Sequence, residues 1–386
     1  MKLGINFFGP IYSEDGIGEA ARSTLKSFLA ANIDVAINPL PRPTAREVGS
    51  AQINPGSLNT PYYINYFHFS SRWVPYYLEL LGEKVLQNHY NISHWLCEVI
   101  DYPEEWAVNF KYFQEIWTAS SFCQEAISRL SPVPVLKIPY PIFLFDNHGY
   151  TRKDLNLDDN KFLFLSIANA YSDIERKNIL GTIRAFKEAF PSEDNVGLVL
   201  KLCNTNVEVD YFNRIKELIN NDSRIQIIDE FLDREVISSL YHLTDAYVSL
   251  HRAEGFGLTM AEAMLAKKPV LTTGYSGNLD FCDYFNCFIV DFDLVRVGEN
   301  RMRYKSENIW AEPKIPSAAE GYKEIFRNKA LRDQKANLAF NRISNDFNEA
   351  KIGQLISKRL QTIENRFTWN LHQECMTHKH QFKIED

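Results

Sequence analysis

The chain has 386 residues, of which 45% are hydrophobic and 24% are charged. This composition is that of a folded protein, and the length predicts two domains of about 150 to 200 residues rather than a single core. The formal net charge of −7 argues against a nucleic-acid partner, because such binding depends on neutralising many phosphates.

The sequence also argues against a membrane span and a structural metal site. No run of about 18 apolar residues occurs, so no segment is expected to cross a membrane. The six cysteines are scattered, without a CxxC pair or a histidine cluster, which argues against zinc. We therefore expect a cytoplasmic protein with reduced thiols.

Short apolar runs alternate with amphipathic stretches in the first part of the chain, a pattern typical of βα units and a parallel sheet. Six strands are predicted there, at residues 3–8, 33–37, 62–67, 90–95, 116–119 and 135–138. The pattern breaks at Pro139, at Pro141 and over the polar stretch 147–160. We interpret this break as the connection between two domains, 1–147 and 148–345.

A second alternation follows the connection. Its six predicted strands are residues 162–167, 197–203, 224–228, 246–250, 270–273 and 288–290. A helix over 179–190 is predicted behind Asn178 as N-cap. An amphipathic helix within 346–386 is predicted to pack back on the first domain, from the apolar residues Ile352, Leu355, Ile356, Leu360 and Ile363. The expected fold is α/β, with two Rossmann-like doubly wound parallel sheets.

Ligands of such sheets bind in the loops that follow the strands, and the segment 9–21 is the first of these loops. It contains Gly16, Gly18 and Ala21 in the pattern G-x-G-x-x-A. Glycines at a helix start let backbone N–H groups approach a phosphate, and this pattern is also the fingerprint of a dinucleotide site. The loop is longer than the tight dinucleotide turn, and the second predicted strand ends without an acidic residue. A phosphate-binding loop, a nicotinamide site and a plain flexible turn are therefore all open.

A pair of carboxylates marks the second loop. Glu254 lies in the loop after the predicted strand 246–250, and Glu262 lies in the helix that follows. Gly255 and Gly257 let the backbone come close to a ligand, and the free N–H groups of a helix start suit a diphosphate. Two carboxylates beside a phosphate site suit recognition of hydroxyl groups, one on a sugar and one on a ribose, because each accepts several hydrogen bonds.

The sequence EGFGLTMAE at residues 254–262 resembles that of the family-4 retaining glycosyltransferases, which are group 1 glycosyltransferases of GT-B fold. Further similar segments are residues 91–98, 103–106, 175–178, 268–270, 273–280 and 310–313. The resemblance covers the chain to about residue 345 and is most specific in the second domain. It implies two Rossmann-like domains facing a central cleft, and transfer of a hexose from a nucleoside-diphosphate sugar to a hydroxyl group.

The resemblance also implies roles for individual residues. Glu254 would contact the transferred sugar, and Arg176 and Lys177 would neutralise the leaving diphosphate. Family members carry an arginine about five residues before this lysine, where the chain has Ser172, so Lys201 is a further candidate. The donor-binding residues are expected to be Gly16, Gly18, Lys201, Gly255, Phe256, Gly257, Leu258, Thr259 and, on the nucleotide ribose, Glu262.

The first domain is expected to supply the acceptor side. Glu98 and His94 lie in the stretch that ends a predicted strand and are the candidates nearest the reacting centre, although a packing role for His94 is open. His68 ends another strand. Asp291 and Asp293 form a D-x-D, the metal motif of another glycosyltransferase fold, but they follow a late strand in a different context, so no metal is expected.

The implied reaction is transfer with retention at the anomeric carbon, without a cofactor or metal. The departing phosphate oxygen can take the acceptor proton, so no enzyme base is required. The acceptor would be a hydroxyl of a glycan or lipid-linked glycan, as in polysaccharide biosynthesis, and a lipid-linked acceptor would bring the protein to a membrane surface. Two alternatives are a GT-B nucleotide-sugar epimerase, which needs no acceptor, and a non-catalytic protein that binds sugar nucleotides.

Overall fold

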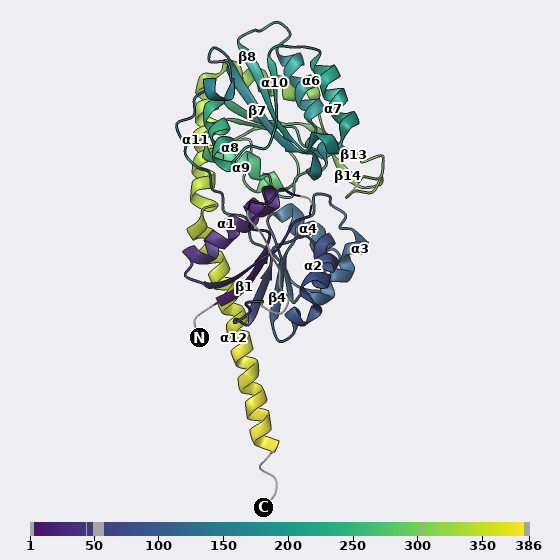
Figure 1. Cartoon of the computed structure of the whole chain (residues 1–386), viewed down its shortest axis with the longest axis vertical. Coiled ribbons are helices and arrows are strands. Elements are labelled where there is room, and N and C mark those ends of the chain that lie inside the picture. Colours follow the sequence, from purple (N-terminus) through teal and green to yellow (C-terminus); the bar gives the residue numbers. More distant parts are fainter. Residues whose placement is uncertain (1–3, 44, 49–57, 302, 382–386) are drawn as a thin grey trace, which may run out of the picture.

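A computed structural model describes residues 4–43, 45–48, 58–301 and 303–381, with the side chains of the last helix described as far as residue 366. Figure 1 shows two α/β bodies joined end to end, the first in purple to blue and the second in teal to green. Each body contains one six-stranded sheet, and all the pairings within both sheets are parallel. The predicted α/β fold with two doubly wound sheets is confirmed.

The first sheet has the strand order β2-β1-β3-β4-β5-β6. Its strands are β1 (Gly4–Gly9), β2 (Asp34–Pro39), β3 (Ile64–Phe67), β4 (Tyr90–His94), β5 (Glu115–Thr118) and β6 (Val135–Lys137). The helices of this body are α1 (Gly16–Ala30), α2 (Val74–Leu81), α3 (Glu104–Ala107) and α4 (Ser121–Ser128). The order changes direction beside β1, so the carboxyl ends of β1 and β3 form the crevice where a ligand is expected.

The second sheet has the order β12-β11-β10-β7-β8-β9. Its strands are β7 (Phe162–Asn169), β8 (Val196–Cys203), β9 (Ile225–Asp229), β10 (Ala246–Ser249), β11 (Val270–Thr273) and β12 (Phe288–Val290). The helices are α5 (Ile174–Lys177), α6 (Ile179–Ala189), α7 (Val209–Ile219), α8 (Arg234–Leu243), α9 (Leu258–Leu265), α10 (Ile315–Arg327) and α11 (Lys329–Asp346). Here the order changes direction between β7 and β10, so the loops after these two strands border the crevice.

An antiparallel hairpin was not predicted from the sequence. It consists of β13 (Phe292–Arg296) and β14 (Ile309–Pro313). Tyr304 and Trp310 of this segment are buried in one cluster with first-domain residues such as Trp95 and Cys97. The hairpin therefore belongs to the second body by sequence but packs against the first.

The last helix, α12 (Glu349–Gln381), returns to the first body and runs beside α1 (Figure 1). Ile352, Ile356 and Leu360 are buried in one cluster with Phe28 of α1. Leu355, which was predicted for the apolar face, is 42% exposed instead. Among the described helices, none has the length and apolar composition that crossing a bilayer requires.

The two bodies contact each other directly at the base of the crevice. The Ser120 hydroxyl, at the N-cap of α4, donates to the Gly255 carbonyl at 2.6 Å. Nearby, the Ser121 amide donates to Asp280 at 3.0 Å, and the Lys137 ammonium lies 3.2 Å from the same carboxylate. The first contact positions the loop after β10 against the first domain, and the other two position the segment after β11.

Candidate functional site

A cavity of about 620 Å³ lies between the two bodies, bordered by the loops after β1, β4, β7 and β10. The predicted site residues that line it are Gly16, Glu98, Arg176, Lys177, Lys201, Glu254, Gly255, Phe256, Gly257, Leu258, Thr259 and Glu262. Gly18 and His94 are not among its lining residues. The cavity is therefore built from residues that are distant in sequence, at the carboxyl ends of both sheets.

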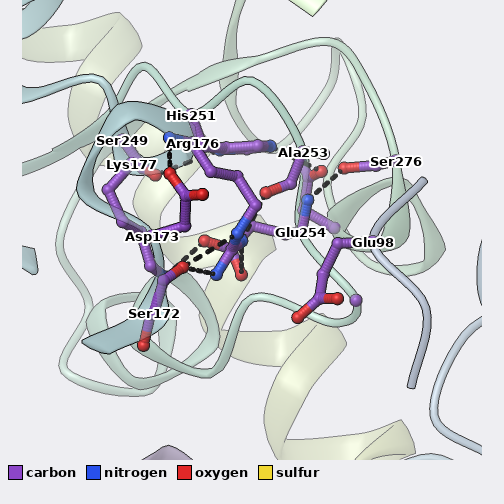
Figure 2. A network of polar contacts seen from close by, with 12 residues as sticks. Glu98, Ser172, Asp173, Arg176, Lys177, Ser249, His251, Ala253, Glu254 and Ser276 are labelled. Carbon is purple, nitrogen blue, oxygen red and sulfur yellow. Dashed lines mark hydrogen bonds and ion pairs between the residues drawn. The ribbon is translucent and has the colours of Figure 1, made fainter. Parts of the chain in front are cut away.

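Glu254 belongs to a buried ion-pair group (Figure 2) and is one of the residues that line the cavity. Its carboxylate accepts a hydrogen bond from the Lys177 ammonium at 2.5 Å and lies 3.2 Å from the Arg176 guanidinium. Its backbone amide donates to the Ser276 hydroxyl at 2.7 Å. Burial by itself would raise the pKa of Glu254, but Arg176 and Lys177 outweigh that effect and hold the pKa well below its ordinary value. The group is therefore a carboxylate throughout the neutral range.

Arg176 and Lys177 are held in place by the short helix α5. The Asp173 side chain caps this helix by accepting from the Arg176 amide at 3.2 Å, and the left-handed Asn178 ends it. The Arg176 guanidinium also donates to the carbonyls of Ala253 and Ser172, at 2.5 and 3.0 Å. Two cations thus face the carboxylate of Glu254, and the charge of Glu98 acts on both of them as well.

Glu262 forms a second ion-pair group, in α9. Its carboxylate accepts from the Tyr241 hydroxyl at 2.9 Å and is paired with Arg234. Burial is the largest influence on Glu262 and raises its pKa, although Arg234 opposes the effect. Arg234 also lies 3.6 Å from Glu19 of α1, so it bridges the two bodies. Arg234 was not predicted from the sequence, although its place at the start of the helix after β9 could have indicated it.

The loop between Glu254 and α9 has the geometry of a helix-terminal anion site. Gly257 adopts φ +101°, a left-handed conformation that favours glycine, and no side chain caps the helix there. The amides of the first helical turn therefore have no capping side chain in this structure, and Leu258 and Thr259 line the cavity beside them. Such a helix start favours a phosphate.

Lys201 lines the cavity, but its ammonium group is already engaged. It donates to the carbonyl oxygens of Leu202 and Glu230, at 2.9 and 2.7 Å. Burial is the main reason that its pKa is lowered. The bond to Glu230 connects Lys201 to the loop after β9. The ammonium would have to give up such bonds in order to make the predicted contact with the donor.

His94 occupies a different place from the one expected for an acceptor-side residue. It is 3% exposed and lies beneath Tyr140, whose ring stacks on it at 4.8 Å between centroids and lines the cavity. Its Nδ1 is 2.9 Å from the Tyr66 hydroxyl. Burial lowers the pKa of His94, and it lowers the pKa of the neighbouring His68 to about 3, so both imidazoles are neutral. Their packing role corrects the expectation that His94 faces the cleft, because the aromatic ring of Tyr140 covers it.

Glu98 does line the cavity, from the segment after β4. Its carboxylate lies 3.8 Å from the Arg303 guanidinium of the β13–β14 hairpin. The first domain therefore presents a carboxylate to the cavity, as predicted, and the second domain supplies its cationic neighbour.

Gly16 and Gly18 belong to the first turn of α1 and not to a flexible glycine loop. Asp15 caps this turn by accepting from the Gly18 amide at 2.9 Å. Gly16 lines the cavity, whereas a Cβ atom added at Gly18 would lie 2.1 Å from the Ser13 carbonyl oxygen. The glycine at position 18 is thus required by the close approach of the preceding turn, which corrects its predicted contact with the donor.

The Gly18→Val variant is therefore expected to unfold at a lower temperature than the wild type. The added side chain collides with a backbone carbonyl, and overpacking of this kind costs about 1–3 kcal/mol. Gly16→Ala is the matched variant, since a Cβ there meets only Leu258 at 3.9 Å. Thermal unfolding followed by circular dichroism compares the two, and equal unfolding temperatures would contradict the assignment.

Two further polar side chains, those of His251 and Asp293, are engaged within the second body. The ring nitrogens of His251 lie within 3.1 Å of Ser249, Tyr275 and Asn278. Asp293 lies on β13 and pairs with Lys314 at 3.0 Å. Within the described ranges, no three His, Cys, Asp or Glu side chains are grouped so that they could hold a metal ion.

The second body resembles a known family in its sequence, and almost the whole chain resembles solved structures in its fold. Residues 150–295 match the model of the family described as glycosyl transferases group 1. No curated protein sequence matches the chain.

Solved structures resemble the chain over almost its whole length. A glycosyltransferase from Rickettsia africae has a TM-score of 0.68 at 16% identity, covering 94% of this chain and 98% of its own. Sucrose-phosphate synthase from Thermosynechococcus elongatus has a TM-score of 0.67 at 14% identity, covering 94% and 100%. HepE from Anabaena, solved with UDP and glucose, has a TM-score of 0.63 at 16% identity, covering 93% and 100%. The chain therefore has the GT-B fold.

Proposed function

We propose that the protein is a retaining glycosyltransferase of family 4, which transfers a hexose from a nucleoside-diphosphate sugar to a hydroxyl acceptor in the cytoplasm. The observation that carries this proposal is the buried carboxylate of Glu254, held by Arg176 and Lys177 beside an uncapped helix start in an interdomain cavity. The match of residues 150–295 to group 1 glycosyltransferases supports it. Because HepE was solved with UDP and glucose, a UDP-sugar is the first donor to test.

The arrangement suggests how the donor would bind. The diphosphate would lie at the start of α9, where the amides of the first turn and the cations Arg176 and Lys177 meet its charge. The sugar would then lie against Glu254, and the ribose hydroxyls against Glu262. Because Arg234 is paired with the Glu262 carboxylate in this structure, the ribose hydroxyls would have to displace Arg234 or share the carboxylate with it.

The proposed chemistry needs no base from the protein. As the bond between the anomeric carbon and the phosphate oxygen breaks, Arg176, Lys177 and the helix amides stabilise the charge on the leaving diphosphate. The acceptor oxygen bonds to the anomeric carbon on the same face, and its proton passes to the departing phosphate oxygen. This scheme assigns no proton transfer to His94, which does not line the cavity and whose pKa is lowered by burial, or to His251, whose ring nitrogens are engaged.

The proposal is tested by incubating the purified protein with UDP-glucose, UDP-N-acetylglucosamine, GDP-mannose and ADP-glucose. Slow release of the nucleoside diphosphate is expected with at least one of these donors. Nuclear magnetic resonance of the sugar distinguishes hydrolysis from isomerisation. Isomerisation without release would identify an epimerase instead, and binding without either reaction would identify a non-catalytic protein.

The activity is expected to survive an excess of EDTA. The physical reason is that the charge of the diphosphate would be met by Arg176, Lys177 and the start of α9, so the proposed mechanism assigns no task to a divalent cation. Turnover is measured with and without EDTA, and with Mn²⁺ added back. Loss of turnover that Mn²⁺ restores would contradict the proposal and direct attention to Asp291 and Asp293.

A further inference from the structure

The turn that leads into α5 holds an aspartate in a strained backbone conformation. Asp173 adopts φ +66° and ψ 98°, which lies outside the left-handed helical region that aspartate and asparagine tolerate. Strained residues of this kind persist only where the surrounding contacts fix them, and they are concentrated at functional sites. Asp173 directly precedes the helix that carries Arg176 and Lys177, so its conformation sets the direction in which this short helix begins.

The contacts of Asp173 within the turn do not neutralise its charge. Its carboxylate accepts from the Arg176 amide at 3.2 Å, and its own amide donates to the Ala170 carbonyl at 3.1 Å. The side chain is only 4% exposed. A carboxylate that is buried to this extent requires a cationic partner as well as hydrogen bonds.

Arg301, in the segment between β13 and β14, provides this partner. Its Nε atom lies 3.3 Å from one carboxylate oxygen of Asp173 and 3.2 Å from the other, and its side chain is 13% exposed. The Arg301 amide donates to the Tyr304 carbonyl at 2.8 Å, and the guanidinium also pairs with Glu299. The arginine is therefore fixed within its own segment and reaches an aspartate 128 positions away in the sequence.

The same segment contacts the turn at a second point. The Arg303 guanidinium donates to the Tyr171 carbonyl at 2.9 Å, two residues before Asp173. The turn is thus fastened to the segment between β13 and β14 at both of its ends. Arg301 is not among the residues that line the cavity, so any effect it has on the cavity must pass through Asp173.

We propose that Arg301 is a positioning residue, which acts through its ion pair with Asp173 on the two cations of α5. The contacts are continuous, because Arg301 pairs with Asp173 and Asp173 bonds the Arg176 amide. Arg176 and Lys177 in turn hold the Glu254 carboxylate. Without Arg301 the strained turn should relax and move both cations. This inference rests on the proposed function, because it takes these cations as the partners of the diphosphate.

The test compares Arg301→Gln with the wild type in the full chain, using UDP and uridine as probes. UDP affinity, measured by calorimetry, should fall about fivefold to tenfold, because the displaced cations would contact its diphosphate. Uridine has no phosphate, so its affinity, measured by saturation-transfer nuclear magnetic resonance, should be equal in both proteins. Turnover of UDP-glucose should fall further, about tenfold to thirtyfold, because misplaced electrostatic groups cost most in the transition state.

Two more variants assign the effect to the ion pair. Arg301→Lys should restore most of the turnover, because an ammonium group can reach the carboxylate that Arg301 contacts through Nε. Asp173→Asn keeps a side chain that can cap the helix but removes the charge. It should match Arg301→Gln, and the double variant should lose no more than either single variant, since both remove the same interaction.

Lys305→Gln is the matched control. Lys305 belongs to the same segment as Arg301 and pairs with Glu105 at 3.1 Å, and both of its partners in this pair are half-exposed. Exposed ion pairs contribute little to stability, so this variant should keep wild-type turnover and UDP affinity. It separates loss of the contact with Asp173 from a general disturbance of the segment.

Wild-type UDP affinity and turnover in Arg301→Gln would overturn the proposal, as would additive losses in the double variant or an equal loss of uridine binding. Thermal unfolding shows whether each variant is folded, and Asp173→Asn takes the place of Arg301→Gln if the latter does not fold. If the wild type binds GDP or ADP and not UDP, that nucleotide and its nucleoside are the probes. Failure of the wild type to bind any of the three would count against the proposed function, so the two failures are distinguishable.

Discussion

Replacing Glu254 by glutamine is expected to lower turnover roughly tenfold to a hundredfold while leaving UDP affinity equal to the wild type or tighter. The lost interaction is a charge-assisted hydrogen bond to the transferred sugar, of about 1.5 to 3 kcal/mol. UDP should bind at least as well, because the variant frees Arg176 and Lys177 from their carboxylate partner. The turnover rate is measured at steady state and the UDP affinity by calorimetry, both on the same preparations of variant and wild type.

The same substitution should also lower the unfolding temperature. Glu254 is 7% exposed, and removal of one member of a buried ion pair leaves the other charges without compensation. Glu312→Gln is the matched control, because Glu312 is half-exposed and pairs with Arg252 away from the cavity lining. Wild-type turnover in a folded Glu254→Gln protein would remove Glu254 from the sugar site, and a parallel loss of UDP affinity would move it to the nucleotide.

Lys177→Met is expected to reduce turnover by about two to three orders of magnitude, the range found when one preorganised electrostatic donor is removed from an active site. Methionine keeps most of the volume of the side chain but has no positive charge. UDP affinity should fall as well, by about tenfold, because the ammonium would lie beside the diphosphate in the ground state too. The excess loss of turnover over binding measures what Lys177 contributes only in the transition state.

Lys187→Met is the control for this experiment. The Lys187 ammonium, in the last turn of α6, donates to the carbonyls of Leu218 and Ile219 at 2.9 and 3.3 Å. Its loss should affect stability and not turnover. If Lys177→Met reduced UDP affinity and turnover by the same factor, the lysine would only hold the nucleotide. If it reduced neither, the leaving group would be stabilised by Arg176 and the helix amides alone.

Glu254 and Glu262 lie in different electrostatic environments, and their pKa values are shifted in opposite directions. Arg176 and Lys177 lower the pKa of Glu254 despite its burial, whereas burial raises the pKa of Glu262 despite Arg234. Glu254 is therefore fixed by cations that the donor would share. Glu262 is paired with a single arginine that also reaches Glu19 across the cleft, so the proposed ribose site would be coupled to the contact between the domains.

The positions of the strands could be predicted from the sequence alone. All twelve predicted strands occur, and for example the prediction 270–273 corresponds to β11 and the prediction 246–250 to β10. The reason is local: a parallel strand buried on both faces is a short apolar run, and its limits are set by the polar and glycine residues beside it. The predicted helix behind Asn178 has the same kind of explanation, because the cap and the apolar spacing are contained in a dozen residues.

Other features of the site depended on contacts between residues far apart in the chain. Lys177 and Glu254 are separated by 77 positions, and nothing in the spacing indicated that the loop after β7 would fasten the carboxylate after β10. Lys201 looked similar to Lys177 as a basic residue beside a strand, yet its ammonium is bound by backbone carbonyls. Lys177 lies in the short helix after β7 and Lys201 near the end of β8, and only their three-dimensional neighbours show which ammonium group faces Glu254.

By itself, the sequence determined the two parallel sheets and the loop of Glu254 and Glu262, because apolar runs and glycine positions act over a few residues. Only the tertiary structure decided which side chains reach the cavity. It buried His94 beneath Tyr140, and it brought Arg303 from the segment between β13 and β14 of the second domain into the cavity lining beside Glu98 of the first. Such placements follow from how two separately wound sheets pack together, and the free energy of that packing is spread over many contacts that no local pattern contains.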